Sequence, residues 1–316
     1  MRTDKFILTA LAALVLGACS NDNEPQPQSS FPEDGQVRIT AGINDIVTRA
    51  GVDNSNITGK EIGFFFTTPR KTKYTYANRK LTHNGSEWAA DENMYWADKT
   101  TAVNVTAYSP WQEGAGIATP LAYETPGDQA TATALEAADW VYANRDVNPA
   151  TTGNGGLTAD GKIDLPLRHI LSKIELTLTI GTDIKDETPD AAITAVVIKG
   201  LKKNGTVNLS DGQTTVSAEN NSTVDITPCH NETTGVYEAI FLPQEVGSGD
   251  FSVSVQFSTG KTYVYTLSSV YTFAANTLYK LPIQVGTSTP NVAFTKEGIT
   301  GESWGTEESL GSHITD

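Results

Sequence analysis

The chain alternates apolar and polar residues over short stretches that are separated by turn signals. A period of two is seen in Val37-Ile39-Ala41-Ile43 and in Ile174-Leu176-Leu178-Ile180, and this period places alternate side chains on one face of a strand. β-Branched and aromatic residues favour further strands in the segments 61–67, 102–108, 192–199, 237–241, 251–257, 261–267 and 278–285. Pairs such as Asn84-Gly85 and Asn204-Gly205 predict turns between strands. The pattern predicts an antiparallel all-β protein.

The length of the chain predicts two domains. Its 316 residues exceed the size of one typical β-sandwich. We place an N-terminal β-sandwich domain at residues 37–170 and a C-terminal β-sandwich domain at residues 171–316. The Gly- and Thr-rich stretch 148–162 is interpreted as an exposed loop of the first domain. Only residues 129–143 have a helical composition, and they predict one short helix or turn.

The N-terminus has the parts of an export signal. A basic start and an apolar run from Phe6 to Leu16 precede Leu16-Gly17-Ala18-Cys19, which matches a bacterial lipobox at all four places. We predict a signal peptide at residues 1–18, followed by acyl chains on Cys19 that hold the protein to a membrane. Residues 19–36 are acidic and proline-rich with little apolar content, so they predict a flexible lipidated tether.

Charge and cysteine content exclude some classes of protein. The net charge of -15 argues against binding nucleic acid through a basic face, since that requires clustered Lys and Arg. Cys229 is the only cysteine besides Cys19, so the mature chain has no partner for an intramolecular disulfide. The fold must therefore be stabilised by packing.

No pattern in the sequence predicts catalysis, a cofactor or a metal site. The four histidines are far apart and lie outside zinc-binding motifs, and no G-x-S-x-G presents a nucleophile. His169 lies in a strand-like stretch and is interpreted as a histidine hydrogen-bonded between sheets. Core packing is favoured over a sugar-binding platform for the five tryptophans, which are Trp88, Trp96, Trp111, Trp140 and Trp304. Trp304 is the exception, because it lies near the end of a polar tail with no obvious core of its own. We expect a non-enzymatic protein.

Two segments near the ends of the chain have complementary features. An amphipathic strand at Val37 to Val47 precedes Thr48-Arg49-Ala50-Gly51, where a protease could cut between Arg49 and Ala50. The cut would release the first strand and expose backbone groups that a neighbour's tail could pair with by strand addition. Arg38 is a second choice, but a cut there would leave most of the strand in place. The candidate donor residues of the tail, from about residue 290, are Val292, Phe294, Ile299 and Trp304.

The sequence resembles the fimbrillin family, including its Mfa-like group, over nearly the whole chain. The resemblance is carried by LGACS at the lipobox, TRAG at Arg49, HILSKIELTL from His169, AIFLPQ ending at Gln244, and FAANTLYKLPIQV from Phe273 to Val285. It implies two tandem transthyretin-like β-sandwich domains with Greek-key-type antiparallel sheets. It also implies delivery of a lipidated precursor to the outer membrane, cleavage after Arg49 by an arginine-specific protease, and assembly with other pilus subunits by donor-strand exchange. The implied function is a structural and adhesive one in a cell-surface pilus.

Two alternatives stay open on the sequence. Lys296, Glu297 and Gly298 interrupt the alternation of the tail, so a stalk position in a pilus is favoured only slightly over a tip position, and an anchor position also stays open. The alternative function is a surface-anchored lipoprotein that binds a glycan or a protein without polymerising. A glycan would need exposed aromatic side chains such as Trp88 or Trp111.

Overall fold

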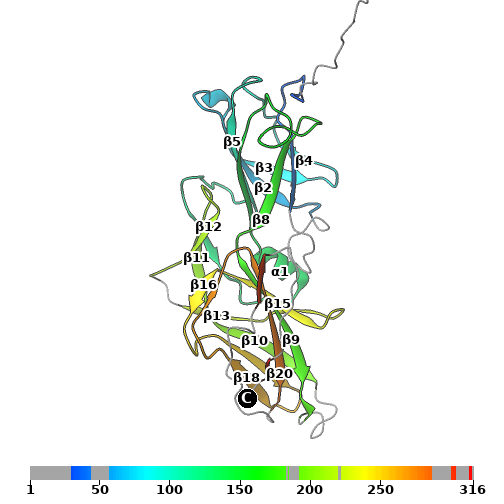
Figure 1. Cartoon of the computed structure of the whole chain (residues 1–316), viewed down its shortest axis with the longest axis vertical. Helices are drawn as coiled ribbons and strands as arrows, with labels where there is room; N and C mark the ends of the chain where they lie inside the picture. Colours follow the sequence, from blue (N-terminus) through cyan, green and yellow to red (C-terminus); the bar gives the residue numbers. More distant parts are fainter. Residues whose placement is uncertain are drawn as a thin grey trace, which may run out of the picture.

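The structure is a computed structural model that describes residues 30–43, 57–182, 184, 192–219, 222–286, 300–303 and 313–314. Figure 1 shows an elongated molecule in which the two halves of the chain occupy opposite ends. Strands form nearly all of the regular structure, which confirms the predicted all-β class. One α-helix, α1 (Ala132–Ala138), occurs among the described residues and lies within the segment predicted to be helical. The hydroxyl of Thr131 caps it by accepting the N–H of Ala134 at 3.1 Å.

The first half of the chain forms one curled sheet of seven strands with the order β1-β8-β7-β5-β2-β3-β4. The strands are β1 (Ile39–Ile43), β2 (Glu61–Thr67), β3 (Tyr76–His83), β4 (Trp88–Ala90), β5 (Val103–Ser109), β7 (Val141–Val147) and β8 (Ile163–His169). Ile39 of one edge strand and Trp88 of the other belong to the same buried cluster. The sheet therefore curls around a core that both of its edges cover.

β2 lies at the centre of this half and is buried on both faces. Phe64 and Phe66 pack into the core inside the curled sheet, whereas Phe65 packs into a cluster on the other side. Such a strand reads as a continuous apolar run rather than an alternation. A Cβ at Gly63 would collide with the ring of Tyr108, so the glycine permits close packing of that ring. The loop after β2 contains a short 3-10 helix, η1 (Thr72–Tyr74).

The second half of the chain forms a two-layer sandwich. One sheet has the order β13-β10-β17-β18 and the other the order β14-β15-β9-β20-β21. The bounds are β9 (Ser172–Ile180), β10 (Ile193–Lys202), β13 (Thr223–Ile226), β14 (Cys229–Asn231), β15 (Val236–Phe241), β17 (Ser252–Phe257), β18 (Thr262–Thr266), β20 (Thr277–Val285) and β21 (Thr300–Ser303). The facing sides share a core that includes Ile174, Phe251 and Leu281. A separate ribbon pairs β16 (Gln244–Val246) with β19 (Tyr271–Phe273).

A strand from the first half joins the second half at the junction. β6 (Leu121–Glu124) pairs with β11 (Asn204–Asn208), which also pairs with β12 (Gln213–Val216). A third buried cluster combines side chains of both halves, such as Tyr108 and Leu242. The predicted division between residues 170 and 171 falls in the short connection from β8 to β9, where both residues are fully buried.

Two polar side chains buried at the junction, Gln129 and His169, have hydrogen-bond partners on distant segments. The amide of Gln129 donates to the Ile240 carbonyl oxygen at 2.7 Å and accepts the Ile240 N–H at 2.8 Å. Nδ1 of His169 lies 3.0 Å from Oδ1 of Asp139. His169 is thus a buried, hydrogen-bonded histidine, although its partner follows α1 instead of lying on a facing sheet. These bonds offset the cost of burying the polar groups.

Asn204-Gly205 begins β11 and does not form the turn that the sequence predicts. Gly205 lies opposite Val216 of β12 in the ladder. A Cβ on this glycine would lie 2.5 Å from the carbonyl oxygen of Thr215 and 2.8 Å from Cδ1 of Leu242. Close packing, rather than turn geometry, therefore accounts for the glycine.

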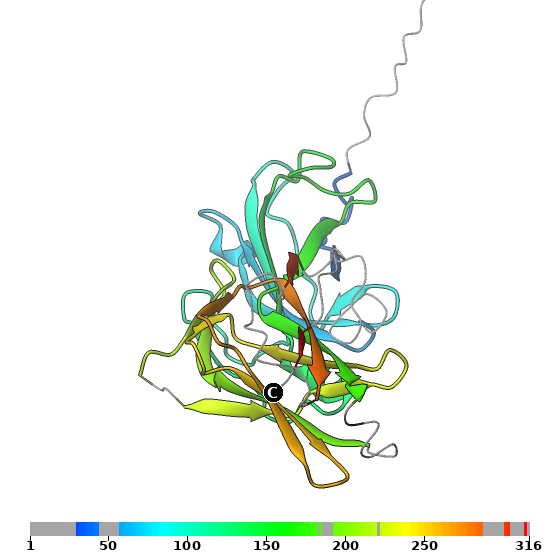
Figure 2. The same ribbon diagram turned by 60° about the horizontal axis from the view of Figure 1, so that its bottom comes forward.

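The described parts of the tail lie along β20 (Figure 2, red beside orange). β21 (Thr300–Ser303) pairs antiparallel with the first residues of β20, and β22 (His313–Ile314) pairs parallel with Ile283 and Gln284. β20 itself runs parallel to β9, as β1 runs parallel to β8, so the described residues contain three parallel pairs in otherwise antiparallel sheets. None of the helices in the described residues is long and apolar enough to cross a membrane.

Candidate functional site

The first strand of the chain, β1, lies at the edge of the curled sheet. It pairs with β8 in a parallel register that runs from Ile39 opposite Ile163 to Ile43 opposite Leu167. The N–H of Ile163 donates to the Arg38 carbonyl oxygen at 2.9 Å. Because backbone groups alternate between the two sides of a strand, Pro166 turns its nitrogen away from β1 and removes no bond from this ladder.

The other side of β1 is held by β4 and by the loop that follows β4. The indole N–H of Trp88 donates to the Ala41 carbonyl oxygen at 3.0 Å. Just before the strand, the N–H of Val37 donates to the Met94 carbonyl oxygen at 2.8 Å. A groove of about 170 Å³ remains between the two edges, and its lining includes Val37, Leu81, Trp88 and Met94. β1 therefore covers most of the opening of the curled sheet.

The side chains of β1 alternate between the core and solvent, as the sequence predicts. Val37, Ile39 and Ala41 are 8%, 3% and 7% exposed, whereas Thr40 is exposed. Burying a Val or Ile side chain contributes about 1.5–3 kcal/mol, so Val37 and Ile39 together hold the segment with roughly 3–6 kcal/mol of apolar burial. Loss of β1 would open the core and leave the edge of β8 unpaired.

A polar contact fixes the start of the segment. The guanidinium of Arg38 donates to both carboxylate oxygens of Asp34. This hydrogen bond, the N–H of Gln36 and the charge of Arg38 lower the pKa of the Asp34 carboxyl to about 2. The same contact raises the pKa of Arg38. The pair is exposed to solvent, so it orients the chain ahead of β1 more than it stabilises the fold.

Most of the predicted site residues lie outside the described residues. These are Cys19, the Arg49–Ala50 cleavage site, and the tail residues Val292, Phe294, Ile299 and Trp304. Arg38, the second choice for cleavage, is described. Its carbonyl group belongs to the ladder with β8, so the peptide bond after it is held within the sheet. A protease would have to unpair the strand before cutting there.

The tryptophans and the cysteine of the described residues belong mainly to the core. Trp88 is 7% exposed, so the suggestion that it could serve an exposed glycan platform is wrong: its ring covers β1. Trp96 and Trp140 are also buried, and Trp111 is partly buried with Nζ of Lys80 5.0 Å from its ring centre.

Burial raises the pKa of the Cys229 thiol. Among the described residues, no group of three or more His, Cys, Asp or Glu side chains could hold a metal ion.

The fold and the β1 site define a class of protein: an elongated two-part β protein whose own first strand completes its N-terminal sheet. Residues 48–304 match the family described as fimbrillin-like, so the chain belongs to that family. The matched region begins after β1 and includes both halves of the fold.

Individual relatives agree with this family. A putative fimbrium subunit, Fim1C of Bacteroides uniformis, is 26% identical over 224 residues, which are 67% of each chain. A crystal structure of a putative cell adhesion protein from Bacteroides uniformis has a TM-score of 0.60 at 19% identity and covers 86% of this chain and 100% of its own. Another, from Bacteroides ovatus, has a TM-score of 0.61 at 18% identity, with 86% and 99% covered. At these identities, the two structures support the fold.

Proposed function

We propose that the protein is a structural, non-enzymatic subunit of a cell-surface pilus that contributes to adhesion. It is exported as a lipoprotein, carried to the outer membrane by acyl chains on Cys19, and trimmed between Arg49 and Ala50. Removal of β1 opens the curled sheet, and the tail of a neighbouring subunit replaces the strand beside β8. Membership of the fimbrillin-like family supports the pilus role.

One observation carries the strand-exchange step. β1 is bound at an edge, through one β-ladder and a single row of inward side chains, and it precedes the candidate cleavage site in the chain. A strand bound in this way can be replaced by another strand that supplies the same alternation, because main-chain hydrogen bonds do not depend on sequence. The described tail segments β21 and β22 pair with β20 of the same chain, so they must leave it before donating.

Limited proteolysis of the full chain with an arginine-specific protease tests this proposal. We expect a new N-terminus at Ala50 by mass spectrometry, followed by a ladder of oligomers on a gel. An Arg49→Gln variant should escape this cut, whereas the matched Arg38→Gln variant should be trimmed like the wild type. A trimmed chain that stays monomeric and binds no synthetic peptide of residues 287–316 would refute the exchange step.

A further inference from the structure

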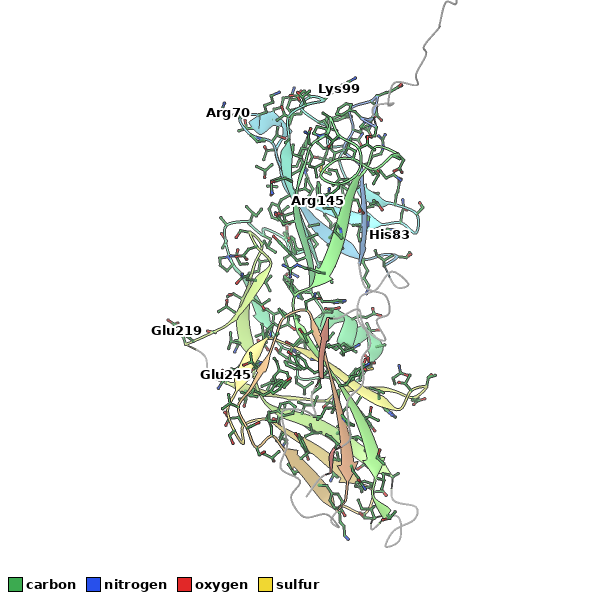
Figure 3. All side chains as sticks on the ribbon, in the orientation of Figure 1. Arg70, His83, Lys99, Arg145, Glu219 and Glu245 are labelled. Atoms are coloured by element: carbon green, nitrogen blue, oxygen red, sulfur yellow. The ribbon has the colours of Figure 1, made fainter. Side chains whose placement is uncertain are left out.

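A group of basic residues lies at the end of the molecule formed by the first half of the chain. Arg70, Lys71 and Lys73 occur together in the loop between β2 and β3, and Lys99 lies in the loop before β5. Figure 3 shows Arg70 and Lys99 at the upper end of the molecule. We call Arg70, Lys73 and Lys99 the basic apex. In a chain with a net charge of -15, such a cluster creates a local field opposite in sign to the rest.

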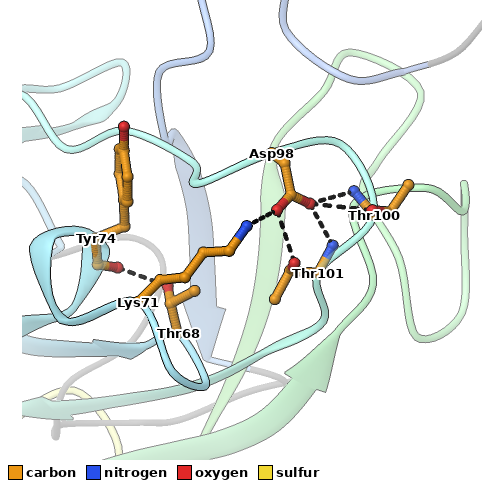
Figure 4. Close-up of polar contacts among 6 residues, drawn as sticks. All are labelled: Thr68, Lys71, Tyr74, Asp98, Thr100 and Thr101. Atoms are coloured by element: carbon orange, nitrogen blue, oxygen red, sulfur yellow. Dashed lines mark hydrogen bonds and ion pairs between the residues drawn. The ribbon is translucent and has the colours of Figure 1, made fainter.

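The two loops of the apex are tied together and held in one conformation. The hydroxyl of Thr68 donates to the Tyr74 carbonyl oxygen at 2.6 Å and closes the first loop. Lys71 forms an ion pair with Asp98 of the second loop (Figure 4). Asp98 also accepts the N–H of Thr101 at 2.6 Å. These bonds keep the pKa of the Asp98 carboxyl well below its usual range, so the contact stays charged at neutral pH.

The charge of Lys71 is compensated by its ion pair with Asp98, whereas the charges of the three residues of the basic apex are open to solvent. Arg70, Lys73 and Lys99 are all exposed. None of the ion pairs seen among the described residues involves them. Exposed cations on loops that are already held in place suit an acidic partner, because little ordering of the loop backbone remains to oppose binding.

Lys99 of the basic apex lies beside the segment that leads into the first strand. Nζ of Lys99 lies 5.6 Å from the ring centre of Phe31, and Ser30 hydrogen-bonds Thr152 of a neighbouring loop at 2.8 Å. From here the chain runs into β1, parallel to β8. A replacement strand that keeps this direction must start at the same end of the molecule, so the subunit that donates it approaches the end that carries Arg70 and Lys99 (Figure 3).

The opposite end of the molecule is where the tail of the chain starts. β9 and β20 run in parallel toward that end (Figure 1) and finish at Ile180 and Val285. The connection from β9 to β10 leaves from the same end and has the sequence Thr182-Asp-Ile-Lys-Asp-Glu-Thr-Pro-Asp190, with four acidic residues and one lysine. A donating subunit therefore brings an acidic segment together with its tail.

We propose that the basic apex binds the acidic segment 183–190 of a second copy of this chain and so guides each subunit onto the next. This inference rests on the proposed strand exchange and adds the surface on which the donor docks. Opposite charges on the two surfaces accelerate encounter and orient the tail toward the vacated edge of β8. The burial of the donated strand then retains the subunit.

The rate of assembly of trimmed protein tests the apex. The triple variant Arg70→Glu, Lys73→Glu, Lys99→Glu should assemble about 10-fold or more slowly than wild type at low ionic strength, a difference that salt should remove by screening. The matched control Lys199→Glu, Lys202→Glu, Lys203→Glu changes the net charge equally on β10 and its following residue and should assemble like wild type. Adding Asp183→Lys, Asp186→Lys and Glu187→Lys to the apex variant should restore the rate.

A second measurement separates this inference from the proposed function. Uptake of a synthetic peptide of residues 287–316 by trimmed monomers reports strand exchange without docking, and the apex variant should take it up at the wild-type rate. Normal peptide uptake with an unchanged assembly rate in the apex variant would overturn the docking inference alone. Loss of peptide uptake in wild type would refute strand exchange. Carbodiimide cross-links from Lys73 or Lys99 to the acidic segment of another chain would support the docking directly.

Discussion

Shortening Ile39 is the most direct test of how β1 is held. Its side chain is 3% exposed and packs inside the curled sheet, so Ile39→Ala removes buried methyl groups and leaves a cavity that a paired strand cannot close. Ile-to-Ala changes at buried sites cost about 2–5 kcal/mol. With a urea m-value of about 2 kcal/mol/M, this predicts a fall of roughly 1–2.5 M in the unfolding midpoint.

Tryptophan fluorescence during urea unfolding of the uncut chain provides the assay. Trp88 and Trp96 lie in the same core as Ile39, so their emission reports on the region that loses the side chain. The matched control is Thr40→Ala, whose side chain is exposed on the next position of the strand and should change stability by less than about 0.5 kcal/mol. Equal midpoints for the two variants would refute the burial of β1 and, with it, the reasoning that removal of the strand opens the core.

Three further experiments test contacts and burial in the described structure. Gln129→Leu leaves the N–H and carbonyl of Ile240 without their side-chain partner and should destabilise the fold by about 2–4 kcal/mol in the same assay; an unchanged midpoint would contradict the junction described. The pKa of Asp34 is lowered in the folded chain, so the stability that comes from its contact with Arg38 is fully present above pH 3.8 and is lost as the pH falls through about 2. Asp34→Asn should therefore flatten the curve of stability against pH over that range. Identical curves for the variant and the wild type would count against the contact. The Cys229 thiol, which is buried and has a raised pKa, should react with a thiol reagent only after denaturant is added.

Strands that bury one face or both could be predicted from the sequence. The predicted segment 61–67 coincides with β2, and the predicted segment 278–285 begins one residue inside β20. In β20 the alternation indicates which face meets a core, whereas the continuous apolar run of β2 indicates burial on both faces. The same reasoning identified β1, since Val37, Ile39 and Ala41 are inward and Thr40 is outward. Local alternation is sufficient where burial follows the strand period.

Contacts between distant segments could not be predicted, because no local pattern encodes them. The role of Gln129 depends on Ile240, which is 111 residues away. The role of Trp88 depends on Ala41, on the other edge of the curled sheet. Gly205 looked like a turn residue because Asn-Gly is a common hairpin sequence, but it is a close-packed position in β11, the middle strand of a three-stranded sheet. In each case the tertiary neighbour decides the role.

Burial and charge have separate roles in the proposed assembly. The apolar side chains of a strand beside β8 contribute only once the strand is seated, so they slow its departure and have little effect on the first encounter. The cations of the apex act at longer range but are screened by salt and contribute little to a seated complex. It follows that Ile39→Ala should change how long the native first strand stays after trimming, and that reversal of Arg70, Lys73 and Lys99 should change how fast a neighbour arrives. A variant that combined both changes should therefore show each effect at its single-variant size in its own measurement, because the residues lie on separate elements and act on different steps.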